Sequence, residues 1–469
     1  MKRRIIANLS KEMVFCLERE RGWTYPELRE QVCRFAAYFT LNKVGRVCIQ
    51  LEQGFYAYAA ITAAYLSGTV FCVIDKNQPI ERKQYITGAF LPDLYIVLTN
   101  ADKFADNSMS IEEFGYWNGS VESLVRDNKH IYVLFTSGST GRPKGVLVKS
   151  SAIERLVSWA IPEFDLCGDD IYGQYAPLFF DMSMLDVFAA VSVGCSIVPF
   201  SSMADKLRPA NLIEKFGITF WNSVPQVLEV LENSGGFKSE KLKSLRTIKF
   251  GGDKIYQLQI EKLFTLLPDC NVVLTYGPTE ITVFCTYAKM NRADYKSFSK
   301  GIMTMGKAVP GWDVRLKDEE SGVGEIVVCG AYIGDGYIDG ASGAFFKRTG
   351  ETEYTEYSTG DFAEEIDGYY YFHGRRDNQV KLNGIRVDLS EIENALIGVG
   401  CKRFEVIAQN DLIYLAYVDV QADEKFIRGT LIKKLPKYLV PSVVKRFDSF
   451  PLTPNGKTDR QALIKELSK

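Results

Sequence analysis

Apolar positions along the chain alternate between helical spacing and short continuous runs. Spacings of three and four residues predict a helix over 24–40, and a second helix is expected over 54–67. The apolar runs at 46–51 and 70–74 predict short strands beside these helices. The alternation continues at 131–135, 153–160, 196–200, 207–215, 218–221, 225–233, 246–250, 256–266 and 271–274. This pattern predicts an α/β fold whose mostly parallel sheets carry helices on their faces.

The pattern changes twice in the later part of the chain. From residue 303 glycines become dense, and β-rich runs such as 325–329 and 369–372 predict an antiparallel or barrel-like part. After Asp377 helices and strands mix again, with elements expected at 389–397, 403–408, 412–420 and 424–434. The second change predicts a separate arrangement of helices and strands in the last part of the chain.

The composition is that of an ordinary globular protein. Apolar residues make up 46% and charged residues 24% of the 469 residues, so a fibrous or disordered chain is not expected. The 56 basic and 58 acidic side chains give a net charge of −2, which argues against nucleic acid as the main partner. Because neither a signal peptide nor a membrane-spanning run is recognised, we expect a cytoplasmic protein without a membrane partner.

Cysteine and histidine usage limits the chemistry. The ten cysteines form no C-x-x-C pair and mostly lie in apolar runs, which favours reduced, buried thiols over disulfides. His130 and His373 are the only histidines, so a histidine-ligated metal centre is set aside. We therefore expect the chemistry to depend on charge placement rather than on imidazole proton transfer.

A loop rich in glycine and hydroxyl side chains follows the predicted strand at 131–135. It contains Thr136, Ser137, Gly138, Ser139, Thr140, Gly141 and Lys144. Converging backbone N–H groups, hydroxyl donors and a lysine suit a polyphosphate. The loop differs from the common P-loop, because Pro143 stands where that motif has glycine before lysine. A flexible surface loop is the alternative interpretation.

A second polar segment follows the predicted strand at 271–274. The Gly-Pro turn at 277–278 directs Thr279 and Glu280 away from the strand end. A carboxylate near a phosphate loop suggests a Mg²⁺ ligand, since Mg²⁺ typically takes one or two carboxylates together with phosphate oxygens. Taken alone, this segment fits an ordinary turn equally well.

These segments and others in the same order resemble the adenylate-forming superfamily of acyl-CoA synthetases, luciferases and amino-acid adenylation domains. The resemblance covers nearly the whole chain, and the order of motifs is more specific than any one of them. The motifs lie at 23–28, 136–146, 180–183, 251–253, 276–280, 324–326, 336–337, 358–361, 374–381 and 454–460.

The resemblance implies a two-domain architecture. The large N-terminal domain would span 1–376 and contain mostly parallel sheets with flanking helices, plus a small β-barrel-like part. The small C-terminal domain would span 377–469 and form a mobile α+β lid, with Asp377 as its hinge.

The resemblance also implies how ATP and Mg²⁺ are held. The loop from Thr136 to Lys144 would hold the β- and γ-phosphates, Thr279 would contact the α-phosphate, and Glu280 would bind Mg²⁺. Lys457 would reach between the substrate carboxylate and the α-phosphate, although a solvated lysine in a turn is its alternative. Contacts to adenine, ribose and the rest of the nucleotide would come from Gly251, Gly252, Asp253, Tyr276, Asp361 and Arg375.

Asp181 points to an amino acid as the substrate. In amino-acid adenylation domains the aspartate at this place pairs with the α-ammonium, and acyl- or aryl-activating relatives usually lack an acid there. The alternative is a carboxylate that caps the helix starting near Ser183. Leu185 and Asp186 resemble the D-alanine–carrier-protein ligase branch more than the large nonribosomal peptide synthetases.

Lys249 is the exception in an otherwise mostly apolar substrate wall. The implied wall residues are Met182, Leu185, Asn222, Lys249, Gly251, Thr275, Val283 and Phe284. A buried ammonium needs a partner. If the substrate supplies it, with Asn222 donating beside it, the substrate is an acidic or polar amino acid. If Lys249 instead pairs with Asp253, the pocket is small and suits alanine.

We therefore expect an ATP- and Mg²⁺-dependent ligase that activates an amino acid as aminoacyl-AMP, as in nonribosomal peptide synthesis. The aminoacyl group would then pass to the phosphopantetheine thiol of a carrier protein. The carrier is expected to be a separate protein, because no carrier motif follows Lys457. An acyl- or aryl-CoA ligase is the alternative function.

Overall fold

The chain folds into two compact units in the computed structural model. It describes residues 1–136, 142–320, 322–340, 345–348, 354–375, 379–397, 404–418, 423–451, 458 and 460–467. The first unit comprises Met1–Lys76, Phe90–Leu134 and Gly145–Arg376, and the second comprises Asn77–Ala89, Phe135–Lys144 and Asp377–Lys469. Within the described residues, no helix combines the length and apolar character needed to cross a membrane.

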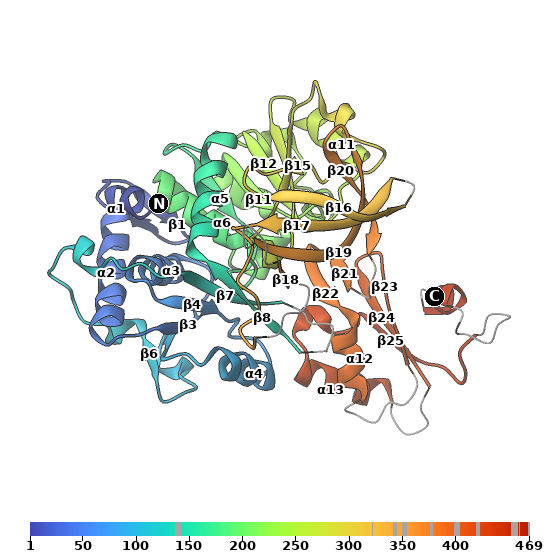
Figure 1. The fold of residues 1–469 in the computed structure, drawn as a ribbon, viewed down its shortest axis with the longest axis horizontal. Helices are drawn as coiled ribbons and strands as arrows, with labels where there is room; N and C mark the ends of the chain where they lie inside the picture. The colour runs from blue at the N-terminus through green and yellow to red at the C-terminus, as the bar shows by residue number, and fades with distance from the viewer. Residues whose placement is uncertain are drawn as a thin grey trace. The chain divides into compact units, whose positions relative to one another are not determined.

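The largest element of the first unit is a nine-stranded sheet (Figure 1). Its strands in spatial order are β15 (Lys307–Ala308), β14 (Thr286–Met290), β13 (Asn271–Tyr276), β12 (Thr247–Gly251), β11 (Phe220–Ser223), β9 (Ile171–Gln174), β10 (Ser196–Pro199), β1 (Val14–Leu17) and β2 (Gly22–Thr24). The strands from β13 to β1 run parallel, while β14, β15 and β2 pair antiparallel at the two edges. The central strands are buried on both faces, as a parallel sheet between helical layers requires.

A second sheet has six strands. In spatial order they are β6 (Ser108–Ser110), β5 (Leu94–Val97), β3 (Arg46–Gln50), β4 (Val70–Val73), β7 (His130–Thr136) and β8 (Lys144–Lys149). The pairs from β6 through β7 are parallel. The described cysteines are all free, and only Cys167 among them is exposed, in line with the expected reduced thiols.

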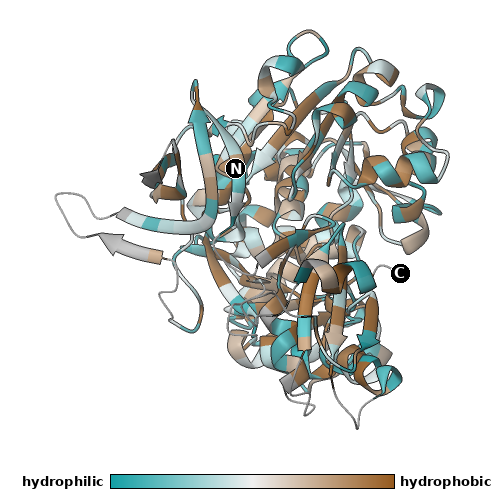
Figure 2. Cartoon of the chain, turned by 90° about the vertical axis from the view of Figure 1, so that its right-hand side faces the viewer, coloured by the Kyte–Doolittle hydropathy of each residue, from teal (hydrophilic) through white to brown (hydrophobic). Residues whose placement is uncertain are grey.

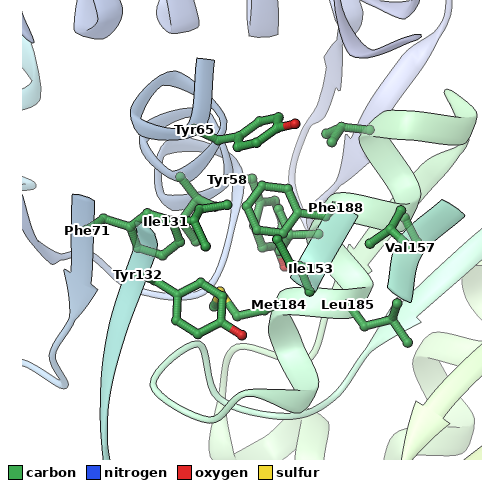
Figure 3. Packing of buried hydrophobic residues seen from close by; sticks show 14 of the residues in the cluster. Tyr58, Tyr65, Phe71, Ile131, Tyr132, Ile153, Val157, Met184, Leu185 and Phe188 are labelled. Atoms are coloured by element: carbon green, nitrogen blue, oxygen red, sulfur yellow. The ribbon is translucent and has the colours of Figure 1, made fainter. Parts of the chain in front are cut away.

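Helices α2 (Tyr25–Leu41), α3 (Phe55–Ser67), α5 (Ser150–Glu163) and α6 (Met182–Val193) pack with both sheets in one apolar cluster. Helix α3 is apolar on all sides and almost wholly buried, which is typical of a helix enclosed by other layers. Figure 3 shows Tyr58 and Tyr65 of α3 beside Phe188 of α6, with Phe71 of β4 close by. Hydrophobic residues gather on the strands in Figure 2, and peripheral loops are mostly hydrophilic.

An antiparallel sheet follows in the first unit, as the glycine-dense, β-rich pattern predicted. It contains β16 (Asp313–Glu320), β17 (Val323–Gly330), β19 (Tyr354–Ile366) and β18 (Phe345–Arg348), with β20 (Tyr369–Arg375) paired to β19. All its pairings are antiparallel. Because Asp361 of β19 pairs with Arg375 of β20, this sheet brings two of the predicted nucleotide-binding residues together.

The second unit has its own apolar core, formed by helices and short strands after residue 378. Its elements are β21 (Gln379–Leu382), β22 (Ile385–Asp388), α12 (Leu389–Ile397), β23 (Phe404–Gln409), β24 (Leu412–Tyr417), α13 (Glu424–Lys434), β25 (Val443–Arg446) and α14 (Arg460–Leu467). Strand β24 pairs antiparallel with β23 and parallel with β25. This mixture matches the predicted α+β character.

Candidate active site

The candidate site lies where three central strands of the large sheet end. In the parallel ladder Asn222 of β11 is directly opposite Lys249 of β12, and Gly251 of β12 is opposite Thr275 of β13. Because side chains alternate along a strand, Lys249 and Gly251 lie on the same face of the sheet. Ligands of α/β proteins typically bind at this carboxyl edge of the strands. The first unit thus gathers four of the predicted substrate-wall residues on neighbouring strands.

Three predicted nucleotide-binding residues form a hydrogen-bonded group. The hydroxyl of Tyr276 donates to Oδ2 of Asp361 at 2.6 Å, and Nη1 of Arg375 donates to Oδ1 at 2.6 Å. Nη2 of Arg375 also donates to the carbonyl of Thr359 at 3.2 Å. A carboxylate oxygen can accept more than one hydrogen bond, so Asp361 keeps acceptor capacity for a ligand hydroxyl.

The turn after β13 is held tightly against the chain that follows it. A Cβ at Gly277 would lie 2.5 Å from Cα of Phe284, so only glycine fits there. Thr279 and Glu280 follow in the short helix η4 (Thr279–Ile281). Glu280 is buried, and one of its carboxylate oxygens accepts a hydrogen bond from the Tyr337 hydroxyl at 3.1 Å. The turn therefore holds a hydroxyl and a carboxylate in fixed places.

Asp181 faces this turn. It stands at the N-cap position of α6, but within the described residues its side chain makes no capping hydrogen bond. The side chain of Thr279 and the backbone N–H of Met182 are the two hydrogen-bonding groups that act on its pKa. Burial raises the pKa of Asp181 to about 6, the Thr279 hydrogen bond lowers it, and the nearby Glu280 charge raises it. Its carboxylate thus lies at the start of α6 and close to the turn that carries Thr279 and Glu280, and its role toward a substrate stays a prediction.

A buried polar network surrounds Lys249. Its ammonium donates to Oδ1 of Asn222 at 3.1 Å, and Nδ2 of Asn222 donates to Oδ1 of Asp186 at 2.6 Å. The Tyr172 hydroxyl donates to the same Asp186 oxygen at 2.9 Å. Burial lowers the pKa of Lys249 and raises that of Asp186, while the opposite charge of each partner acts in the other direction.

The expected alternative pairing of Lys249 with Asp253 is wrong. Oδ2 of Asp253 accepts from Nε2 of Gln226 at 2.7 Å, and its Oδ1 accepts from the backbone N–H of Lys254 at 2.7 Å. The counter-charge of Lys249 is Asp186, to which sequence reasoning gave no such role. The available signal was an aspartate inside the apolar run of α6, since a buried carboxylate requires a partner.

Other predicted wall residues line the same strand ends. A Cβ at Gly251 would lie 2.8 Å from Oγ1 of Thr275 and 3.5 Å from Cε of Met182, which places these two side chains around Gly251. Thr282 and Val283 both have positive φ, at 68° and 70°. Such backbone is strained for β-branched residues and is frequently found at functional sites.

Phe284 and Leu185 are buried in the apolar cluster that packs against the sheet. The Lys249 ammonium lies 5.2 Å from the centre of the Phe284 ring, within the range of a cation–π contact. Leu185 is buried in the same cluster as Ile153 and Val157, which Figure 3 shows beside it. The substrate-wall role of these residues stays a prediction.

The remaining predicted residues are only partly placed. Thr136 ends β7 and Lys144 begins β8, and both are half-buried members of the second unit. Gly252 adopts a positive φ of 86° next to Asp253. Seven predicted residues lie outside the described residues, namely Ser137, Gly138, Ser139, Thr140, Gly141, Asp377 and Lys457.

The described side chains of the site are too few to complete the coordination of a metal ion, so a bound ion would need ligands from the substrate or from water. Within the described residues, no group of three or more His, Cys, Asp or Glu side chains could hold a metal ion. Glu280 supplies one buried carboxylate. This fits Mg²⁺, which commonly completes its shell with phosphate oxygens and water.

The sheets and the site define an adenylate-forming enzyme. A family model described as "AMP-binding enzyme" matches residues 6–338, and the chain belongs to this family. The resemblance recognised in the sequence is thereby confirmed.

Relatives with a stated function include two kinds of amino acid–carrier protein ligase. A D-alanine–D-alanyl carrier protein ligase of Listeria monocytogenes serotype 4b is 27% identical over 490 residues, with 95% of this chain and 94% of the relative covered. An L-proline–[L-prolyl-carrier protein] ligase of Streptomyces coelicolor is 34% identical over 354 residues, covering 71% of this chain and 65% of the relative.

Solved structures share the fold. The Vibrio cholerae adenylation domain AlmE in complex with glycyl-adenosine-5'-phosphate has a TM-score of 0.89 and 24% identity, covering 100% of this chain and 97% of that chain. The o-succinylbenzoate CoA synthetase of Bacillus subtilis has a TM-score of 0.81 and 17% identity, covering 98% and 97%. The predicted α/β fold class is thereby confirmed.

Proposed function

We propose that this enzyme activates an amino acid with ATP and transfers it to the phosphopantetheine thiol of a separate carrier protein. The observation that carries the proposal is the half-buried carboxylate of Asp181, whose pKa is raised to about 6 by desolvation. Within the described residues it forms no ion pair, and it lies between the first residue of α6, Met182, and the turn at Thr279, both of which act on its pKa. A partly desolvated carboxylate without an ion-pair partner is matched by the α-ammonium of an amino acid.

The reaction has two steps. First, a carboxylate oxygen of the amino acid attacks the α-phosphorus of ATP, the bond to the β-phosphate oxygen breaks, and pyrophosphate leaves. Second, the carrier thiol, having lost its proton to solvent, attacks the acyl carbon through sulfur, and AMP leaves as the C–O bond breaks. Positioning and charge stabilisation supply the catalysis, which is consistent with a chain that has two histidines.

Different described residues bind different parts of the amino acid and of ATP. Asp181 pairs with the α-ammonium, Thr279 contacts the α-phosphate, and Asp361 accepts from the ribose hydroxyls. Tyr276 and Arg375 hold the Asp361 carboxylate in place through their 2.6 Å hydrogen bonds. Glu280 holds Mg²⁺, which when bound offsets phosphate charge.

Residues outside this group complete the proposal. The loop from Thr136 to Lys144 holds the β- and γ-phosphates, and Lys457 stabilises the charge that develops during adenylation. The domain division at 376/377, with Asp377 as the hinge of the lid, is part of the same proposal.

The ligases of Listeria and Streptomyces support the choice of an amino acid and a carrier protein, since their names state both. An acyl- or aryl-CoA ligase is the second candidate, because a CoA synthetase shares the fold. The fold does not separate the two, and Asp181 favours the amino acid.

The test is amino-acid-dependent exchange of labelled pyrophosphate into ATP. A panel of all proteinogenic amino acids, the D-isomers of the chiral ones, fatty acids and aryl acids is compared at equal concentration. Exchange with amino acids alone, followed by AMP-releasing loading of a pantetheinylated carrier but not of its unmodified form, is the expected result. Exchange with only fatty or aryl acids, and transfer to free CoA, would contradict the proposal.

A further inference from the structure

Three charged or amide side chains meet in the apolar interior behind the strand ends. Lys249 of β12, Asn222 of β11 and Asp186 of α6 are each fully buried. Their hydrogen bonds run from Lys249 to Asn222 and from Asn222 to Asp186, at 3.1 Å and 2.6 Å. Charged groups are almost never buried without a partner. Any donor or acceptor of this network that lacks a protein partner therefore indicates which group a ligand should supply.

The network is incomplete in two places. An ammonium has three N–H donors, and within the described residues Lys249 uses one of them, toward Asn222. Another side of the ammonium faces the Phe284 ring, 5.2 Å away. Oδ2 of Asp186 is buried and has no hydrogen-bond partner among the described residues. Lys249 therefore keeps donor capacity that a ligand acceptor can use.

The charges around this network are balanced by an amino acid with a neutral side chain. Lys249 carries one positive charge, and the negative charges of Asp186 and Asp181 both act on it. The α-ammonium of the substrate neutralises Asp181, and Lys249 neutralises Asp186. An acidic side chain adds an unmatched negative charge, and a basic one adds an unmatched positive charge, both costly in a buried site.

We propose that the activated amino acid has a neutral side chain ending in an oxygen acceptor, a hydroxyl or a carboxamide, which the Lys249 ammonium binds. This inference rests on the function proposed above. An alkyl side chain leaves the buried ammonium without its missing acceptor, whereas a carboxylate satisfies the ammonium but unbalances the charge. Lys249 is thus a specificity-determining residue, and Asp186 sets the charge that it can accept.

Isosteric pairs of amino acids test the inference in the exchange assay. Threonine against valine and serine against alanine compare a hydroxyl with a hydrogen or methyl group. Asparagine against aspartate and glutamine against glutamate compare a carboxamide with a carboxylate. Both chiralities are assayed, and the best substrate should exceed its alkyl and acidic counterparts by at least about tenfold in kcat/KM. A best substrate that is glycine, alanine, alkyl or acidic overturns the inference.

Variants locate the preference in the network. Lys249→Met should reduce the ratio of polar to alkyl substrate by about ten- to a hundredfold, since hydrogen bonds to charged groups are the stronger kind. The matched control is Lys289→Met on β14, whose ammonium donates to the Glu163 carbonyl at 3.0 Å, away from the network. An unchanged ratio in Lys249→Met, or the same loss in Lys289→Met, overturns the inference.

Asp186→Asn tests the charge balance separately. It removes the negative charge and should raise exchange with the acidic isostere of the preferred substrate, aspartate or glutamate, by about tenfold. If single variants do not fold, the double variant Lys249→Met/Asp186→Asn removes both charges and should prefer alkyl side chains. A double variant that still prefers the polar substrate contradicts the inference.

The two proposals fail in different ways. Absence of exchange with every amino acid contradicts the proposed function itself. Strong exchange with an amino acid of the wrong side-chain class leaves the function in place and overturns only the role of Lys249.

Discussion

Two carboxylates of the site, Asp181 and Glu280, have different hydrogen-bonding partners. Glu280 accepts a hydrogen bond from the Tyr337 hydroxyl, while the Thr279 side chain and the Met182 backbone act on Asp181. Burial raises the pKa of Asp181 to about 6, and the Lys249 charge opposes this increase. A carboxylate with this pKa changes its charge within the pH range of ordinary enzyme assays.

We predict that binding of the amino acid weakens as the pH falls through 6. Asp181 is protonated below its raised pKa of about 6 and then cannot pair with the α-ammonium. The kcat/KM for the amino acid should therefore fall toward tenfold per pH unit below 6 and level off above it. Exchange rates measured from pH 5 to 8 give the profile.

Asp181→Asn and Asp186→Asn separate the contributions of these two aspartates in this experiment. Asp181→Asn should lower kcat/KM by roughly 10²-fold or more, as loss of one partner of a buried pair costs about 2–5 kcal/mol, and remove the inflection near pH 6. Asp186→Asn should keep the inflection. An inflection that survives in Asp181→Asn would assign it to another group.

Motifs allowed prediction of some site residues and not of others. Tyr276, Asp361 and Arg375 were predicted together, and the structure joins them by direct hydrogen bonds. The link between Lys249 and Asp186 was not predicted, because it joins a strand to a helix in three dimensions and follows no local pattern. Such pairs are visible in a sequence only as two charges, each in an apolar run.

At the scale of elements, the short connection from β13 to β14 carries much of the site. It includes the Gly277 turn, the helix η4 and the consecutive positive-φ residues Thr282 and Val283. Positive φ at β-branched residues costs on the order of 1–3 kcal/mol each. This connection is therefore kept in shape by its close packing rather than by its local preferences.

We predict that Gly277→Ala lowers the adenylation rate by about tenfold or more. The added methyl group would lie 2.5 Å from Cα of Phe284, so the turn must move and carry Thr279 and Glu280 with it. Overpacking of this kind typically costs about 1–3 kcal/mol of stability. Exchange kinetics and urea unfolding measure the two effects.

The matched control is Gly115→Ala, where no described atom outside its chain neighbours lies within 4 Å of the added Cβ. Its stability should change by about 0.5 kcal/mol or less, and its exchange rate should stay at the wild-type value. Equal rates for Gly277→Ala and wild type would mean that the turn does not position Thr279 and Glu280.

Long, strongly patterned elements were the predictable part of the fold. The helices expected at 24–40 and 54–67 are α2 and α3, and the strands at 246–250 and 271–274 are β12 and β13. Short or polar elements were not predicted, among them α1 (Lys2–Asn8), α4 (Ile80–Phe90), β1 and β2. Their formation depends on contacts distant in sequence, such as the parallel pairing of Cys16 with Ile197.

At the scale of the whole molecule, the two proposed steps need different sets of groups. Adenylation needs charge stabilisation at the α-phosphorus, whereas thioester formation needs access of a thiol to the acyl carbon. The described site in the first unit is proposed to contact the substrates of the first step. The proposed roles of Lys457 and Asp377 distinguish the steps.

We predict that Lys457→Ala separates the two steps. Loss of one group that stabilises developing charge typically lowers a rate by about 10²–10³-fold, and adenylation should fall by that amount. Transfer from supplied aminoacyl-adenylate to the carrier should fall far less. Lys465→Ala, an exposed lysine of α14, is the control and should leave both rates unchanged. Equal losses in both steps would contradict an adenylation-specific role.

The buried pair of Lys249 and Asp186 also limits how the substrate range can evolve. Replacement of either residue alone leaves one charge in the interior, which typically costs about 3–5 kcal/mol, a large share of the stability of a domain. A lineage that changes its substrate must therefore exchange both residues nearly together. Homologues are expected to retain the lysine and the aspartate jointly or to lack both, so the two positions should covary in an alignment.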